Sequence, residues 1–128
     1  MTSVLNVDTI ADKAGTGPVG LTKQHAAKAW SQYEGDGTVS ITGSFNQSGL
    51  SDNGTGDYTL SLTNSMSDAA YAMTSSGTHD SGAYYAWGAV DHDNNGYQAS
   101  SCRMNIGDND GNPEDAELIA AVIHGDLA

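Results

Sequence analysis

The sequence predicts an all-β fold, an antiparallel β-sandwich of about seven short strands preceded by an extended N-terminal arm. Runs of alternating apolar and polar residues recur along the chain, and such alternation puts successive side chains on opposite faces of a half-buried strand. Polar stretches rich in glycine and asparagine separate these runs, as turns between antiparallel strands do. Short strands followed by turn signals are typical of a sandwich.

The composition predicts a thin apolar core. The chain has 128 residues, enough for one domain that buries roughly two thirds of its unfolded surface. Only 38% of the residues are apolar, with just six valines, five isoleucines and one phenylalanine. Six tyrosines and two tryptophans supply larger side chains. We therefore expect burial against other subunits to supplement the core.

The first 22 residues are expected to form the arm, and residues 23–128 the sandwich module. Residues 14–20 (AGTGPVG) have the composition of a flexible linker. The apolar side chains of the arm are Val4, Leu5, Val7 and Ile10. The arm is either a disordered tail or an anchor that orders against a neighbouring subunit or another protein. We favour the anchor, because these side chains would otherwise be exposed.

A short helix or turn is expected over residues 21–25, followed by a strand. Trp30 is interpreted as an anchor of the core, and the alternative is a surface residue that stacks on sugar rings.

The stretch from Gly37 to Leu62 is expected to set the register of the sandwich through two alternating runs that flank a polar turn. The apolar positions are Val39, Ile41, Gly43 and Phe45 in the first run and Tyr58, Leu60 and Leu62 in the second. The Asn53-Gly54 step favours a tight turn. Leu50 is expected to lie in a short strand piece before it.

Four further strands are expected, over residues 68–75, 83–90, 96–106 and 116–124. Residues 74–82 are expected to be a loop. In the second of these strands Tyr85 and Trp87 are assigned to the core, which leaves Tyr84 for contact on the other face. The last segment has helical propensity, but it is apolar on both parities. We interpret it as a central strand or as a strand buried at a subunit contact.

The charge of the chain excludes two classes of partner. Four basic and sixteen acidic residues give a net charge of −12. Nucleic acid binding requires a basic patch, and an anionic membrane repels an acidic surface, so neither partner is expected. No apolar run approaches the length of a membrane span, and no signal peptide is recognisable.

Calcium is the one metal for which the sequence offers a candidate loop. Asp91, Asp93 and Asn95 supply oxygens at alternate positions before Gly96, as in the first half of a calcium-binding loop. The second half departs from this pattern, because Cys102 stands where a bidentate glutamate is needed. The alternative is an ordinary turn rich in aspartate and asparagine. We therefore expect no cofactor, with calcium as the exception to test.

No pattern indicates catalysis. The four histidines show no spacing typical of a metal site, and no Gly-x-Ser-x-Gly elbow is present. The single cysteine, Cys102, is interpreted as a small buried apolar residue. We expect the protein not to be an enzyme.

A recognition surface is expected in the polar loops. The candidates for contact with a glycan, by ring stacking and side-chain hydrogen bonds, are Tyr84, His92, Asn94 and Tyr97.

Four segments carry a resemblance to a known family: Ala27–Trp30 (AKAW), Gly35–Val39 (GDGTV), Ser44–Asn46 (SFN) and Asp52–Thr59 (DNGTGDYT). Together they resemble a small module that recurs in tail-fibre and other virion structural proteins of bacteriophages, many from marine hosts. The resemblance covers most of the chain from about Lys23 onward, and it implies that residues 27–33 form the first strand of the module. Its motifs are strand and turn signatures, so it implies a context rather than a site.

The resemblance implies a non-enzymatic virion structural protein, displayed as a fibre, spike or knob and in contact with the host surface. It would be made in the host cytoplasm, assemble with other virion proteins and form a homotrimer. One alternative is a capsid decoration protein that the arm anchors to the lattice. An alternative from another class is a carbohydrate-binding module.

Overall fold

The computed structural model describes residues 26–78, 85–91, 93 and 95–128. Within these ranges the protein is all-β and contains no helix, which confirms the predicted class. The arm, with Val4, Leu5, Val7 and Ile10, lies outside the described residues, as does the helix or turn expected over residues 21–25. Tyr85 and Trp87 were predicted to lie in the core, but their side chains are also outside the described part of the structure.

The described residues form nine strands, against about seven expected. They are β1 (Ala29–Glu34), β2 (Ser40–Phe45), β3 (Gln47–Gly54), β4 (Asp57–Leu62), β5 (Ala72–Thr78), β6 (Tyr85–Val90), β7 (Tyr97–Gln98), β8 (Ser101–Gly107) and β9 (Leu118–His124). All pairings between them are antiparallel.

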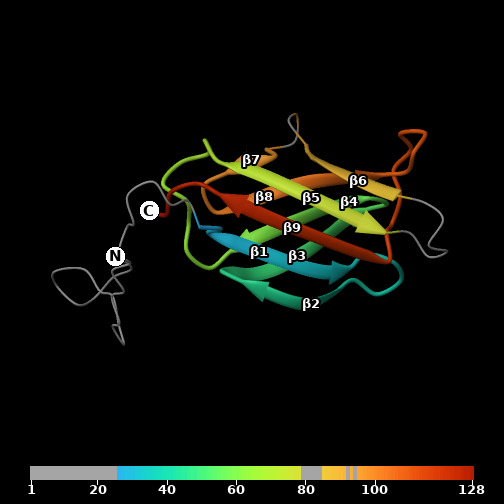
Figure 1. The fold of residues 1–128 in the computed structure, drawn as a ribbon, viewed down its shortest axis with the longest axis horizontal. Coiled ribbons are helices and arrows are strands. Elements are labelled where there is room, and N and C mark those ends of the chain that lie inside the picture. Colours follow the sequence, from blue (N-terminus) through green and yellow to red (C-terminus); the bar gives the residue numbers. More distant parts are fainter. Residues whose placement is uncertain (1–25, 79–84, 92, 94) are drawn as a thin grey trace, which may run out of the picture.

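The strands make two packed layers that share one hydrogen-bonded path, in the order β2-β1-β9-β5-β6-β8-β4-β3. Figure 1 shows β5, β9 and β1 side by side across β8, β4 and β3. The strand β6 pairs with β5 in the first layer and with β8 in the second, so it joins the layers along one side. The edge strands β2 and β3 lie on the opposite side.

Asn46 carries the chain from the first layer to the second, between β2 and β3. Its φ of 55° lies in the left-handed region, which asparagine tolerates better than most residues. Its side-chain Nδ2 donates to the carbonyl oxygens of Lys28 (3.0 Å) and Asn64 (3.1 Å). Its Oδ1 accepts from the backbone N–H of Asn64 (2.7 Å). These bonds tie the crossing point to both layers.

The core fills the space between the layers with alternate residues of four strands. Its largest fully buried side chains are Tyr33, Tyr58, Met66, Met104, Ile106, Ile119 and Ile123. The rings of Tyr33 and Tyr58 meet edge to face, with centroids 5.3 Å apart. The Tyr33 hydroxyl donates to Sδ of Met104 (3.2 Å), which satisfies a polar group that burial would otherwise penalise.

The predicted role of Trp30 in the core is wrong. Trp30 is 42% exposed, whereas Tyr33 on the same strand is fully buried. The inward-facing residues of β1 are Ala29, Ser31 and Tyr33. Alternation establishes that Trp30 and Tyr33 face opposite ways, but it does not establish which of them faces the second layer.

The two alternating runs were expected to flank a turn, but they lie in different layers. The first run is β2, whose one partner among the described strands is β1, and the second is β4, which lies in the other layer. The polar segment between them forms an eight-residue strand, β3, which pairs with β4 through the predicted turn. Edge position leaves β2 exposed, with Ile41 at 42% and Phe45 at 54%.

Two other boundaries differ from the prediction. The strand expected over residues 68–75 begins at Ala72 and continues to Thr78, so part of the expected loop is β5. The single strand expected over residues 96–106 is a hairpin, because a turn at Ala99 and Ser100 separates β7 from β8. The last strand, β9, is confirmed as a central strand, with β1 and β5 as its neighbours.

Candidate functional site

The loop that follows β6 holds the candidate calcium ligands. Asp91 is 8% exposed, and its Oδ1 accepts a hydrogen bond from the backbone N–H of Asp93 (3.1 Å). Asn95 adopts a left-handed φ of 59°. A Cβ on Gly96 would lie 2.0 Å from the Asp91 carbonyl oxygen, so only glycine fits there. These contacts make a tight aspartate-capped turn. His92 and Asn94 lie outside the described residues.

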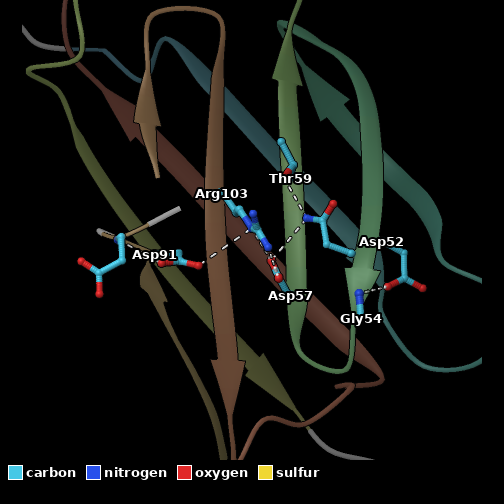
Figure 2. A network of polar contacts seen from close by, with 8 residues as sticks. Asp52, Gly54, Asp57, Thr59, Asp91 and Arg103 are labelled. Atoms are coloured by element: carbon cyan, nitrogen blue, oxygen red, sulfur yellow. Dashed lines mark hydrogen bonds and ion pairs between the residues drawn. The ribbon is translucent and has the colours of Figure 1, made fainter. Parts of the chain in front are cut away.

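Arg103 on β8 lies between the Asp91 carboxylate and Asp57 on β4 (Figure 2). Its Nε donates to Asp57 Oδ1 (2.8 Å), and its Nη2 donates to Asp57 Oδ2, which makes a bidentate pair. Its Nε also lies 3.9 Å from Asp91 Oδ2. The hydrogen bonds from Arg103 lower the pKa of the Asp57 carboxyl, because they favour its charged form.

The network extends to the edge of the second layer. Asn53 Nδ2 donates to Asp57 Oδ1 (3.3 Å) and to Thr59 Oγ1 (2.9 Å). Asp52 Oδ1 accepts from the N–H of Gly54 (2.9 Å), inside the same hairpin (Figure 2). These contacts connect β3, β4 and β8 on their outer face, so the network is a polar staple across three strands.

A shallow groove of about 400 Å³ runs beside the staple, lined by Gly56, Asp57, Asp91, Asn105, Ile106 and Pro113. Its carboxylates and its amide are ligands of the type that calcium prefers. Among the described residues, however, no three acidic, histidine or cysteine side chains gather as a metal site would require. Arg103 also supplies positive charge to both carboxylates, which lowers the attraction for a cation. Calcium binding stays a prediction.

The expected recognition residues are not assembled within the described part of the chain. Tyr97 is half-buried, and its ring packs edge to face on Tyr71, with centroids 5.0 Å apart. The Tyr71 hydroxyl donates to the carbonyl oxygen of Ser101 (2.8 Å), which fixes the pair against β8. Tyr84 lies outside the described residues. Recognition by this set stays a prediction.

Cys102 is fully buried, which confirms its predicted place in the core. Burial raises the pKa of its thiol to about 11, because the charged thiolate is poorly solvated there. A thiol in this environment is unreactive at neutral pH.

The outer surface of the first layer carries a feature that the sequence analysis missed. On β2, β1 and β9 the outward residues include large apolar side chains, with Phe45 at 54%, Trp30 at 42% and Leu118 at 37% exposure. We call this surface the apolar face, and its members are Phe45, Gly43, Trp30, Gln32, Val122, Ala120 and Leu118. The second layer has the polar staple on its outer surface. The two outer surfaces therefore differ in kind.

The sequence carried two signals for the apolar face. Trp30 and Tyr33 have opposite parities on one strand, so one of these large side chains had to face outward. The segment that forms β9 is apolar on both parities, which the sequence analysis attributed to a central position or to a subunit contact. The sequence does not show which face of each strand the opposite layer covers.

Comparisons with protein-family models, with curated proteins and with solved structures found no match to this chain. Among the described residues, no helix is long and apolar enough to cross a membrane.

Proposed function

We propose that this chain is a non-enzymatic structural module of a bacteriophage virion, displayed as a fibre, spike or knob that contacts the host surface. The observation that carries the proposal is the apolar face on the outside of a rigid sandwich. Isolated apolar side chains on a surface are ordinary, but a contiguous row across neighbouring strands is typical of a protein contact. Trp30 pairs directly with Phe45 on one side and with Val122 on the other.

Continuous hydrogen bonding supports a structural role in a particle. Each strand of the first layer is held by antiparallel pairing, and the edge strand β2 continues into β3 through the hydrogen-bonded Asn46. The motifs that resemble phage fibre modules fall on the start of β1, the loop between β1 and β2, the end of β2 with Asn46, and the hairpin of β3 and β4. The charge of −12 favours solubility outside the particle.

Immunogold electron microscopy tests this proposal. An antiserum raised against the recombinant chain is applied to purified particles of the source phage, with pre-immune serum as the control. We expect gold at one defined structure of the particle, with label on the tail supporting the fibre or spike. Label spread over the head would support the alternative, a capsid decoration protein. A chain that is abundant in infected cells but absent from particles in both microscopy and mass spectrometry would overturn the proposal.

A further inference from the structure

The geometry points to a contact between two copies of this chain, in which the apolar faces pack together with their β1 strands antiparallel. The inference concerns the isolated protein and does not depend on a location in a virion. It rests on the exposure, the charge pattern and the strand register of the first layer.

The charge of the chain makes this surface the favourable one for self-association. Two copies that each carry a net charge of −12 repel each other, and the repulsion is smallest where acidic groups are absent. The four strands of the first layer, β2, β1, β9 and β5, contain one acidic residue, Glu34, at the end of β1. The outer surface of the second layer carries Asp57 and borders Asp91 instead.

The two ends of the apolar face carry opposite charge. At one end Lys28 precedes β1, next to the exposed His124 at the end of β9, where the Lys28 N–H donates to the carbonyl oxygen of Ile123 (2.8 Å). At the other end Glu34 and Glu117 line a hollow of about 370 Å³ together with Thr42, Thr78 and Leu118. Glu34 lies six residue steps along the strand from Lys28, a span of about 20 Å.

Strand register arranges the middle of the face in two rows. One row across the strands holds the apolar side chains Phe45, Trp30 and Val122. The next outward row holds Gly43, Gln32 and Ala120, of which Gly43 and Ala120 are small. The Trp30 ring reaches over Gly43, where a Cβ would lie 3.4 Å from two of the ring atoms.

A two-fold axis that crosses β1 between these rows satisfies both patterns. It sets the row of Phe45, Trp30 and Val122 of each copy opposite the row of Gly43, Gln32 and Ala120 of the other copy. It also brings Lys28 of each copy to the hollow that Glu34 and Glu117 line in the other, so the charge pair forms twice. A two-fold contact is isologous, and it therefore gives a dimer rather than the expected homotrimer.

The contact is small, so the dimer is weak. Four strands spaced about 4.8 Å apart and about seven residues long present a flat area below the roughly 800 Å² per partner of a standard interface. We expect a micromolar dissociation constant. Analytical ultracentrifugation of the full chain, at concentrations from about 1 to about 300 µM, covers this range.

Two groups of substitutions in the full chain test the geometry. Trp30→Ser and Phe45→Ser each remove apolar contact from an exposed position, and we expect each to abolish the dimer while leaving the fold intact. Ser51→Asp, on the exposed edge of the second layer, is the control and leaves dimerisation unchanged. Circular dichroism verifies that each variant is folded.

Charge exchange tests the antiparallel arrangement. Lys28→Glu and Glu34→Lys are each expected to raise the dissociation constant by roughly tenfold, because each places like charges together twice in the dimer. The double variant restores opposite charges and returns the constant to near the wild-type value. Asp110→Lys, in the exposed loop between β8 and β9, controls for the change in net charge.

Several outcomes would overturn the inference. A monomer at every concentration would do so, and so would a trimer. If the effects of Lys28→Glu and Glu34→Lys on the dissociation constant simply add in the double variant, the antiparallel arrangement is excluded. If Leu5→Asp abolishes the dimer in a chain that keeps Trp30 and Phe45, the arm covers this surface and the apolar face of the second copy does not.

Discussion

Arg103 is the residue on which the outer face of the second layer depends. It is one of four basic residues in a chain with sixteen acidic ones, and it pairs with Asp57 while lying close to Asp91. The bidentate geometry fixes its side chain across β8 and β4, and a planar guanidinium provides this geometry where a lysine could not. The residue therefore neutralises charge and aligns strands at the same point.

The Asp57 carboxylate is expected to make stability sensitive to acid. Its pKa is lower in the folded protein than in the unfolded chain, because Arg103 donates to its charged form. A group of this kind contributes its full stabilisation above the ordinary carboxyl pKa of about 4, and the contribution is lost as the pH falls through the folded value. We expect Asp57→Asn to lower the free energy of unfolding by about 1 kcal/mol at pH 7.

The difference between the wild type and Asp57→Asn should shrink as the pH falls below the ordinary carboxyl pKa of about 4, and it should disappear once the folded carboxyl is protonated. Urea denaturation at pH 7 and at a series of lower pH values measures it. Asp36→Asn, in the exposed loop after β1, is the matched control, for which we expect little change at any of these pH values. A difference between the wild type and Asp57→Asn that persists unchanged at low pH would contradict this account.

At the scale of elements, the hairpin of β3 and β4 depends on Gly56. This glycine has a φ of +68°, and its N–H donates to Asp115 Oδ1 (2.7 Å). Its carbonyl oxygen accepts from the N–H of Ile106 (2.6 Å), so the turn is joined to β8. A Cβ at this position would lie 2.3 Å from the Ile106 carbonyl oxygen, where backbone leaves no room to move.

Gly56→Ala is therefore expected to destabilise the protein by more than about 2 kcal/mol, since backbone strain adds to a backbone clash. Gly37→Ala is the matched control, because Gly37 has a similar φ of +65° but open space around its Cα. It should cost only about 1 kcal/mol, which is the conformational strain alone. Chemical denaturation monitored by tryptophan fluorescence gives both values. Equal losses of stability in the two variants would show that the backbone around Gly56 moves and relieves the clash.

The elements differ in how well local sequence predicts them. Regular alternation of apolar and polar residues predicted β4, where Tyr58, Leu60 and Leu62 are all buried. The apolar run that forms β9 was also predicted to be a strand. The strand β3 (QSGLSDNG) was only partly foreseen, since glycine and asparagine are poor strand formers. It exists because β4 gives its backbone groups partners, while the Asn53 side chain bonds to Asp57 on β4.

At the scale of the whole molecule, the net charge of −12 opposes the compact state. Salt shortens the range of this repulsion from about 30 Å at 0.01 M to about 8 Å at 0.15 M. We therefore expect the thermal unfolding midpoint to rise by about 2 to 4 °C over that interval of sodium chloride. Differential scanning calorimetry measures the shift, with glucose at equal osmolality as the uncharged control. A midpoint that falls with salt would mean that local pairs such as Arg103 with Asp57 dominate over the net charge.

The arrangement of the two layers also determines what each outer surface offers. The first layer presents the apolar face, and the second presents the polar staple and its groove. Under the proposed function, the apolar face would serve assembly and the polar face would meet solvent. Recognition was predicted in the polar loops and attachment in the arm, and neither position includes the apolar face.

By itself the sequence determined the all-β class, the strand at the end of the chain, the buried Cys102 and the acidic character of the molecule. These properties depend on local alternation and on composition, which the chain carries residue by residue. Only the tertiary structure decided that Tyr33 is buried and Trp30 exposed, and that β2 and β4 lie in opposite layers. The reason is physical: alternation specifies that two faces differ, whereas the packing of strands distant in sequence selects the face that the other layer covers.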